Sequence, residues 1–436
     1  MTRSVRCAWP FALLWAGCGG AGGGGPAVDA AVMPGETVDL VVVSDAARGT
    51  VTVTGPRGPL AASRPGVYTV PLGTRVTLAA APKPGNHFAG MSSNVQRDAG
   101  LTGGLNVNRT QTATVSFLPI THNLVFASSR PFSPTAGIAT YDQACNDLAQ
   151  AVGIDPLSYP FMAWMSTLQE GAGQRIAGYR GFVRMDGRPV ADDLTGEVRY
   201  YPISVDETVQ PAYGTHAFTG TDSSGQVLLA CNGWSQAASL ATTGAINGGP
   251  DYWTADSSSP CSAPLPIYCV MRKFRAAFTP PTAPGKLIFL SDGFLDLGAG
   301  VAAADALCDA EKPAGRGRMV ALLGTTTAPA ASRLVLTASY VRGDGQLVGS
   351  GGDLALGQPL TGLWVHADGS SVRTDRQVVT GGKMPDKMVM AENNCRDLTD
   401  RGLMLSIGRS HHLDNWWSYQ TVPCTEPFVR AYCVEQ

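Results

Sequence analysis

Eight of the ten cysteines in this 436-residue chain form two sets of four with matching spacing. The first set is Cys145, Cys231, Cys261 and Cys269, and the second is Cys308, Cys395, Cys424 and Cys433. Corresponding members lie 163 or 164 residues apart. The sequence from Asp251 to Val270, with its tryptophan, Pro-Cys and Tyr-Cys-Val, returns from Asn415 to Val434. These agreements indicate an internal duplication, and they constrain the fold more than any other feature.

The N-terminus has the features of a bacterial export signal, predicted over residues 1–17. Arg3 and Arg6 precede an apolar run, Ala8–Gly17, that is too short to span a bilayer. Trp15–Cys18 then resembles a lipobox. This resemblance implies that Cys18 is lipidated and anchors the chain to the cell envelope, at the outer membrane or cell surface. Ordinary signal cleavage with release of the protein is the alternative.

The remaining cysteines favour disulfide bonds over a zinc site. Cys7 lies in the export signal and Cys18 in the lipobox, so eight cysteines remain, four in each repeat. Four cysteines per domain in an exported protein indicate disulfide bonds. Their separations lack the close CxxC pairs that zinc sites favour. From the residues alone, three pairings per set stay open.

Composition limits the class of protein and its partners. Charged residues make up only 15% of the chain, whereas Gly and Pro together number 82. This suits loop-rich, extracellular, mostly β structure. The formal net charge of −2 gives no general attraction to nucleic acid, which we do not expect as a partner. Residues 18–35, rich in Gly and Ala after Cys18, are predicted to form a flexible tether.

Residues 36–119 are predicted to form a small all-β module. Short runs rich in β-branched residues, such as Val38–Val43, Arg75–Leu78 and Thr112–Phe117, alternate with Gly, Pro and Asn. The series from Tyr68 through Gly73–Leu78 to Phe88-Ala89-Gly90 resembles the internalin-type B-repeat of bacterial surface proteins. The resemblance implies a spacer without a ligand of its own.

Each repeat has the same predicted order of elements, over residues 121–273 and 285–436. A strand at Leu124–Ser129 is followed by a helix at Tyr141–Val152, which has apolar residues at helical spacing. The second repeat offers a strand at Leu287–Ser291 and a helix at Ala302–Glu311. A second strand, a loop-rich middle and a cysteine-framed end follow in both. The Pro-rich residues 274–284 are predicted to form a semi-extended linker.

Each repeat resembles the bacterial endostatin-like domain, related to the C-terminal domain of collagens XV and XVIII. The first repeat carries the resemblance in Leu124-Val125-Phe126, Ala144-Cys145, Ala163-Trp164-Met165-Ser166, Arg175-Ile176, Asp186-Gly187, Pro202-Ile203, Asp206-Glu207, Thr219-Gly220-Thr221, Cys231, Trp234, Trp253, Cys261 and Tyr268-Cys269. The second keeps its cysteines, Asp344-Gly345, Thr380-Gly381 and Tyr432-Cys433, but lacks the tryptophan that matches Trp164.

The resemblance implies an α+β protein: an all-β module followed by two C-type-lectin-like, disulfide-bonded domains. It also implies nested bridges. These are Cys145–Cys269 and Cys231–Cys261 in the first repeat, and Cys308–Cys433 and Cys395–Cys424 in the second. No cofactor is implied.

Six residues are candidates for ligand binding. The aromatic candidates Trp253, Trp416, Trp417 and Tyr419 lie just before the third cysteine of each repeat. Sugar rings stack on such side chains and protein partners use them as anchors. We expect one tryptophan per repeat to fill the core and Trp416 to be exposed. Arg184 and Arg188 belong to an arginine-rich window that also holds four acidic residues, which favours a mixed solvated surface over a polyanion patch.

The sequence favours neither calcium binding nor catalysis. The Glu-Pro-Asn loop of calcium-dependent lectins is absent, and the nearest string, Gln210-Pro211-Ala212, lacks its last side-chain ligand. The one dense His/Asp group, His411-His412 with Asp414, lies outside any catalytic motif that we recognise. Neighbouring histidines on a strand point to opposite faces, so we expect no metal site there.

These observations predict a non-catalytic, adhesin-like surface lipoprotein. Its paired domains would bind an extracellular matrix protein, a glycan or another envelope component, and its lipid would hold it to the membrane. An architectural envelope lipoprotein without a soluble ligand is the alternative. An enzyme that depends on His412 or Asp414 is a third hypothesis.

Overall fold

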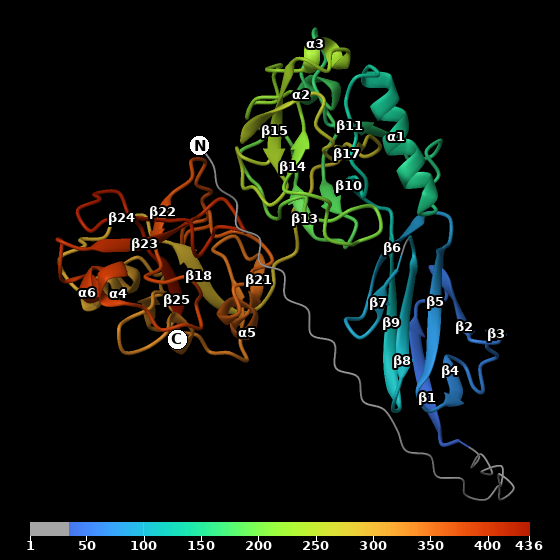
Figure 1. The fold of residues 1–436 in the computed structure, drawn as a ribbon, viewed down its shortest axis with the longest axis horizontal. Helices are drawn as coiled ribbons and strands as arrows, with labels where there is room; N and C mark the ends of the chain where they lie inside the picture. The colour runs from blue at the N-terminus through green and yellow to red at the C-terminus, as the bar shows by residue number, and fades with distance from the viewer. Residues whose placement is uncertain (1–34, 99) are drawn as a thin grey trace, which may run out of the picture.

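A computed structural model describes residues 35–98 and 100–436 of the chain (Figure 1). The predicted signal peptide, Cys18 and almost all of the predicted tether lie outside these residues. The structure is mostly β with few helices and contains four disulfide bonds. The coarse α+β prediction is therefore confirmed. Within the described ranges, no helix is both long and apolar enough to cross a membrane.

Residues 37–119 fold as two packed sheets (Figure 1). The strands are β1 (Thr37–Ser44), β2 (Gly49–Gly55), β3 (Gly58–Pro59), β4 (Val67–Pro71), β5 (Thr74–Pro82), β6 (Asn86–Met91), β7 (Gln96–Arg97), β8 (Thr102–Val107) and β9 (Gln111–Pro119). One sheet has the order β4-β1-β9-β6 and the other β3-β2-β5-β8-β7. Alternate residues such as Leu40, Val76 and Val115 point into one shared core, as the period of two along each strand requires.

The first repeat is built on a five-stranded sheet with the order β11-β17-β10-β12-β13, beside a three-stranded sheet, β14-β15-β16. Its elements are β10 (Asn123–Ala127), α1 (Ile138–Ala151), β11 (Phe161–Ala163), α2 (Ala172–Arg175), β12 (Phe182–Arg184), β13 (Pro189–Ala191), β14 (His216–Phe218), α3 (Cys231–Trp234), β15 (Leu240–Ala245), β16 (Ser257–Pro260) and β17 (Tyr268–Met271). Helix α1 buries Tyr141, Cys145 and Leu148 at helical spacing.

The second repeat has the same strand order, β19-β25-β18-β20-β21 with β22-β23-β24. Its elements are β18 (Lys286–Leu290), α4 (Val301–Ala310), β19 (Met319–Ala321), η1 (Ala330–Arg333), β20 (Ser339–Val341), β21 (Leu347–Ser350), α5 (Gly351–Ala355), β22 (Gln377–Val379), η2 (Ala391–Asn393), α6 (Cys395–Leu398), β23 (Met404–Arg409), β24 (Gln420–Pro423) and β25 (Tyr432–Glu435). The duplication in the cysteines thus extends to the topology of the sheets.

The disulfide bonds are Cys145–Cys269, Cys231–Cys261, Cys308–Cys433 and Cys395–Cys424. These are the pairs that the resemblance implies. The outer bridge of each repeat joins its long helix to the last strand, across 124 or 125 residues. The inner bridge joins α3 or α6 to the loop after β16 or β24.

A partly buried arginine ties the same helix to the same strand in both repeats. Arg175 contacts Asp142 of α1 at 2.6 Å and donates to the carbonyl of Ala163. Arg333 makes the equivalent contact to Asp305 of α4, at 2.5 Å, and donates to the carbonyl of Ala321. Each carboxylate also accepts the amide of that strand residue. The sequence drew attention to Arg175 but not to either aspartate.

The predicted linker, residues 274–284, packs against both repeats. Asn123 donates to the Phe274 carbonyl at 2.8 Å, and the Phe278 amide donates to Asp192 at 2.8 Å. The amide of Ala283 in turn donates to the Gly345 carbonyl of the second repeat. These contacts fix both ends of the linker and limit the motion of the repeats relative to each other.

The short elements α3 and α6 are left-handed turns. All four residues of each have positive φ, between 49° and 72° in α3 and between 47° and 61° in α6. This conformation costs a residue with a Cβ about 1–2 kcal/mol. The turn in α3 includes Asn232 and Gly233, which tolerate it, whereas α6 has Arg396 and Asp397 at these positions.

Replacing Arg396 by Gly should therefore stabilise the protein by about 1 kcal/mol. The Arg396 side chain is 67% exposed and its contact with Asp400 is a long 3.6 Å, so little is lost with it. Urea unfolding measures the change. Arg396→Ala is the matched control, because it removes the same contact but keeps the Cβ, and it should not be stabilising. Equal effects of both variants would show that the turn is not strained.

Candidate ligand-binding site between the two repeats

Three of the four aromatic candidates are buried. Trp253, Trp416 and Trp417 are 1%, 2% and 3% exposed. Trp253 packs on Trp164 and Tyr268, and Trp416 on Tyr432. The prediction that Trp416 is exposed is wrong.

The backbone of each tryptophan segment lies directly on a glycine of the neighbouring strand, which accounts for this burial. A Cβ at Gly244 would lie 1.8 Å from the Trp253 carbonyl oxygen, and one at Gly408 would lie 1.9 Å from that of Trp416. The close approach places the rings in the core, where they cannot stack on a ligand. Tyr419 is 46% exposed, and the Arg409 guanidinium lies 4.9 Å from its ring centroid.

The two arginine candidates differ in what they offer a ligand. Arg184 is only 2% exposed, so it offers a ligand little accessible surface. Its guanidinium contacts both carboxylate oxygens of Asp186 and donates to Ser204 Oγ at 2.6 Å and to the Pro202 carbonyl at 3.2 Å. The desolvated charge is thus fully engaged inside the β12–β13 hairpin.

Arg188 is paired only loosely. Its side chain is 35% exposed, and its Nε lies 3.6 Å from Asp186 Oδ2, beyond hydrogen-bond range. In the described part of the chain, the guanidinium makes no hydrogen bond. Burial lowers the pKa of Arg188, and the neighbouring Arg184 charge lowers it further, while Asp186 opposes both. Two arginines therefore share one carboxylate at this hairpin.

The two repeats are joined by a buried junction. Its first part surrounds residues 199–201 of the first repeat. The Trp364 indole donates to the Arg199 carbonyl at 2.8 Å, and the Thr361 hydroxyl donates to the Tyr200 carbonyl at 2.6 Å. In return, the Tyr201 hydroxyl donates to the Leu347 carbonyl at 2.7 Å. Side chains of the second repeat thus hold the backbone of residues 199–200 in place.

The arginine Arg342 completes this part of the junction. It is 1% exposed and contacts Asp344 at 2.6 Å. Its Nη1 donates to the Thr361 hydroxyl and the Gly362 carbonyl, and its Nη2 donates to the Arg199 carbonyl at 3.3 Å. Arg342 and Asp344 occupy the same hairpin position in the second repeat as Arg184 and Asp186 in the first. In the second repeat, the duplicated ion pair is therefore part of the junction.

The second part of the junction lies between residues 247–249 and residues 411–414. The Gly249 amide donates to the His411 carbonyl at 2.7 Å, and the Leu413 amide to the Asn247 carbonyl at 3.2 Å. A Cβ at Gly249 would lie 2.9 Å from both His411 and Trp364, so only glycine fits this approach. The His411 ring lies 5.9 Å from Trp364 and from Tyr252 of the first repeat.

Acid should weaken this junction through His411. The ring is fully buried, and burial lowers its pKa from 6.5 to about 4, with Asp375 opposing the shift. As the pH falls, His411 is therefore protonated near pH 6.5 in the unfolded chain but only near pH 4 in the folded chain. This contribution to stability is complete above pH 6.5 and falls by roughly 3 kcal/mol as the pH drops to about 4.

Urea unfolding between pH 7 and pH 4 measures this dependence. In His411→Gln the fall should be shallower by roughly the same amount. His87→Gln is the comparison variant: burial also lowers the pKa of His87 to about 4, so it should flatten the pH dependence of the β module and leave that of the second repeat unchanged. If His411→Gln left the slope unchanged, the junction histidine would not account for the acid sensitivity.

The junction encloses one side of a cleft of about 410 Å³. Val205, Val209 and Pro211 line it from the first repeat, and Pro359, Leu360 and Leu413 line it from the second. Arg184, Asp186 and Arg188 supply its charged groups. The cleft therefore combines apolar walls from two domains with a half-exposed cation, which is the usual composition of a small-ligand site.

One wall residue has a strained backbone. Val209 has a φ of 64°, which a β-branched residue rarely adopts. The second repeat has Gly369, with a φ of 87°, at the equivalent position of the equivalent turn. Strain of this kind persists at sites where the side chain has a role that offsets its cost. Sequence reasoning missed this residue, because a valine between Thr208 and Gln210 carries no local signal of a left-handed conformation.

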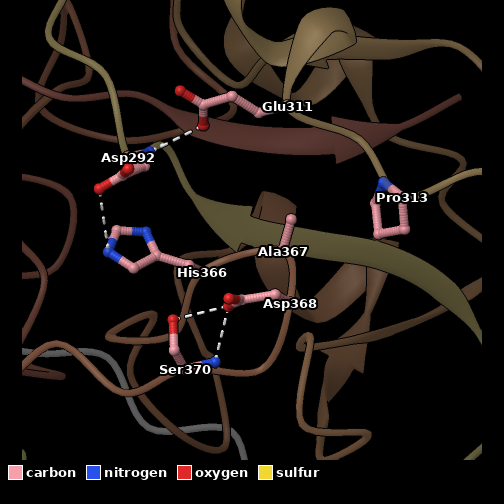
Figure 2. Close-up of a pocket in the computed structure, with 7 residues that line it drawn as sticks. All are labelled: Asp292, Glu311, Pro313, His366, Ala367, Asp368 and Ser370. Carbon is pink, nitrogen blue, oxygen red and sulfur yellow. Dashed lines mark hydrogen bonds and ion pairs between the residues drawn. The ribbon is translucent and has the colours of Figure 1, made fainter.

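A second cleft, of about 420 Å³, lies within the second repeat (Figure 2). Glu311 accepts the amides of Asp292 and Gly293 at 2.7 Å, and Asp368 accepts the amide and hydroxyl of Ser370. His366 Nδ1 is hydrogen-bonded to the Leu290 carbonyl, and its Nε2 lies 3.6 Å from Asp292. Glu311 and Asp368 thus order loops and are not directed together at a ligand.

The structure separates the His/Asp group that the sequence brought together. His411 Nε2 is hydrogen-bonded to the Val372 carbonyl, whereas His412 Nε2 lies 3.8 Å from Asp256, which also binds His216 at 2.8 Å. Asp414 instead accepts a hydrogen bond from Asn247. Within residues 35–98 and 100–436, no three His, Cys, Asp or Glu side chains are placed to hold a metal ion.

No protein-family model matches the chain, and no curated protein matches its sequence significantly.

Proposed function

We propose that this chain is an exported, lipid-anchored and non-catalytic binding protein. In this proposal, Cys18 carries the lipid, the β module is a spacer, and the two repeats are endostatin-like domains of the C-type-lectin-like fold. The repeats act as one head that binds an extracellular matrix protein, a glycan or an envelope component. The lipid would hold the head at the outer membrane or cell surface.

The observation that carries the proposal is the cleft between the repeats. It requires both repeats, because its walls come from each and its position depends on the junction. Four disulfide bonds support export, since such bonds persist in oxidising compartments. Repeated domains held in a fixed arrangement suit recognition better than a loosely tethered pair, because no ordering cost is added on binding.

A binding panel on the immobilised full chain tests the proposal. The panel contains matrix proteins, heparin and other glycans, each with calcium and then with a chelator. We expect saturable binding that survives chelation and is weakened by Arg188→Gln or Tyr419→Ala. Loss of binding with the chelator would show that calcium takes part. A folded protein that binds nothing on the panel would favour the architectural alternative.

A further inference from the structure

We propose that the cleft between the repeats binds a small monocarboxylate with an apolar body, whose carboxylate pairs with Arg188. This inference rests on the proposed function, because it names a ligand class for the same cleft. It follows from the charge of the site, the incomplete pairing of Arg188 and the apolar walls.

The charges of the cleft leave one cation without a full partner. Arg184 and Arg188 both face Asp186, but Arg184 takes both of its oxygens. Arg188 is left at 3.6 Å from the carboxylate, and its guanidinium donates no hydrogen bond to the described residues. Together, Arg184, Arg188 and Asp186 carry a net charge of +1, which a ligand with one negative charge would neutralise. A dianion would place excess negative charge beside Asp186.

The shape of the guanidinium favours a carboxylate as that anion. A planar fork of N–H groups accepts two carboxylate oxygens side by side. The Tyr201 ring supports the fork from one side, with its centroid 5.6 Å from Arg188 and 5.9 Å from Arg184. Because Tyr201 is itself held by its hydrogen bond to Leu347, the cation is positioned before a ligand arrives.

The walls define the rest of the ligand. Val205, Val209 and Pro211 face the cleft from one repeat and Leu360 and Leu413 from the other. A volume of about 410 Å³ accommodates a small molecule but not a folded domain. An aliphatic or aromatic body of about six to ten carbon atoms would cover these side chains and exclude water from the ion pair.

Val209 marks a difference between the two repeats at the wall of the cleft. A glycine would relieve the strain of its positive φ, as Gly369 does in the second repeat. The valine instead lines the cleft and also packs against the apolar core of the β module, close to Gly90. The second repeat, where this turn lines the cleft of Figure 2, keeps the relaxed residue.

Titration calorimetry on the full chain tests the inference with 3-phenylpropionate, 4-methylpentanoate and octanoate as probes. At least one should bind saturably with one site per chain, and its amide, which lacks the charge, should bind about tenfold more weakly or worse. Arg188→Gln should weaken binding by a similar factor. Arg180→Gln is the matched control, because Arg180 pairs with Asp192 and does not line the cleft, and it should leave the affinity unchanged.

A second variant tests the cleft from the opposite repeat. Leu413→Trp should fill it and weaken the same probe, with the fold checked by circular dichroism. Equal binding of acid and amide, or full affinity in Arg188→Gln, would overturn the inference, as would the absence of saturable binding for all three probes. If a panel ligand bound in an Arg188-dependent way while the probes did not, the proposed function would stand and only the ligand class would fall. If neither bound, both would fall.

Discussion

Replacing Arg342 by Met is expected to destabilise the second repeat by about 3–5 kcal/mol and to loosen the junction. The loss has two causes. Asp344, whose side chain is only 12% exposed, would keep its charge without its partner. The Thr361 hydroxyl and the carbonyls of Gly362 and Arg199 would also lose a charged donor in a buried place.

Urea unfolding of the full chain measures this effect, and Arg373→Met is the matched control. Arg373 also reaches across the junction, to Glu197 at 2.7 Å, but both side chains are about half exposed or more. Such a pair contributes about 1 kcal/mol or less. If the two variants were equally destabilising, the buried ion pair would not hold the junction together.

The second large effect is expected when the outer disulfide of the first repeat is removed. The double variant Cys145→Ala, Cys269→Ala should lose about 4–5 kcal/mol, because the bridge closes a span of 124 residues in the unfolded chain. A loss of that size is comparable to the whole stability of many domains. The bridge also joins α1 to β17.

Removal of the inner bridge is the control for the outer one. Cys231 and Cys261 are only 30 residues apart, so the entropic loss should be about 1 kcal/mol smaller. Tryptophan fluorescence in urea follows both variants, because Trp164 and Trp253 lie in the core of this repeat. A greater loss from the inner bridge than from the outer would contradict the account based on chain entropy.

The framework of each repeat was predictable from local patterns. The spacing of the cysteines revealed the duplication. The apolar period of Tyr141–Val152 predicted a helix, which in the structure begins at Ile138 and ends at Ala151. Asp186-Gly187 and Asp344-Gly345 mark turns between paired strands in both repeats. Each of these signals lies within a short stretch of sequence. It can therefore be recognised without knowing which residues pack against that stretch in the fold.

The environment of the candidate side chains was not predictable in this way. Trp416 is buried because Gly408, on strand β23, lets its backbone approach closely. Arg184 and Arg188 lie four residues apart in the same hairpin, yet only Arg188 remains available to a ligand. The difference depends on which guanidinium the Asp186 carboxylate reaches in three dimensions, and no spacing in the sequence encodes it.

The junction between the repeats was even less predictable from the sequence. Trp364 and His411 sit in loops without a motif, and their partners lie more than 150 residues away in the first repeat. A duplicated sequence describes what the two copies share, whereas the junction uses the places where they differ. Trp364 in the second repeat, for example, occupies the position that Ser204 holds in the first.

Hydrogen exchange at the Gly249 amide is the most direct test that the two repeats form one head. This amide donates to the His411 carbonyl at 2.7 Å, across the junction and away from any regular sheet. We predict that it exchanges as slowly as amides of the central strands β10 and β18, because it opens only when the junction does. Exchange at the rate of an exposed loop would contradict the fixed head and, with it, the cleft on which the proposed function depends.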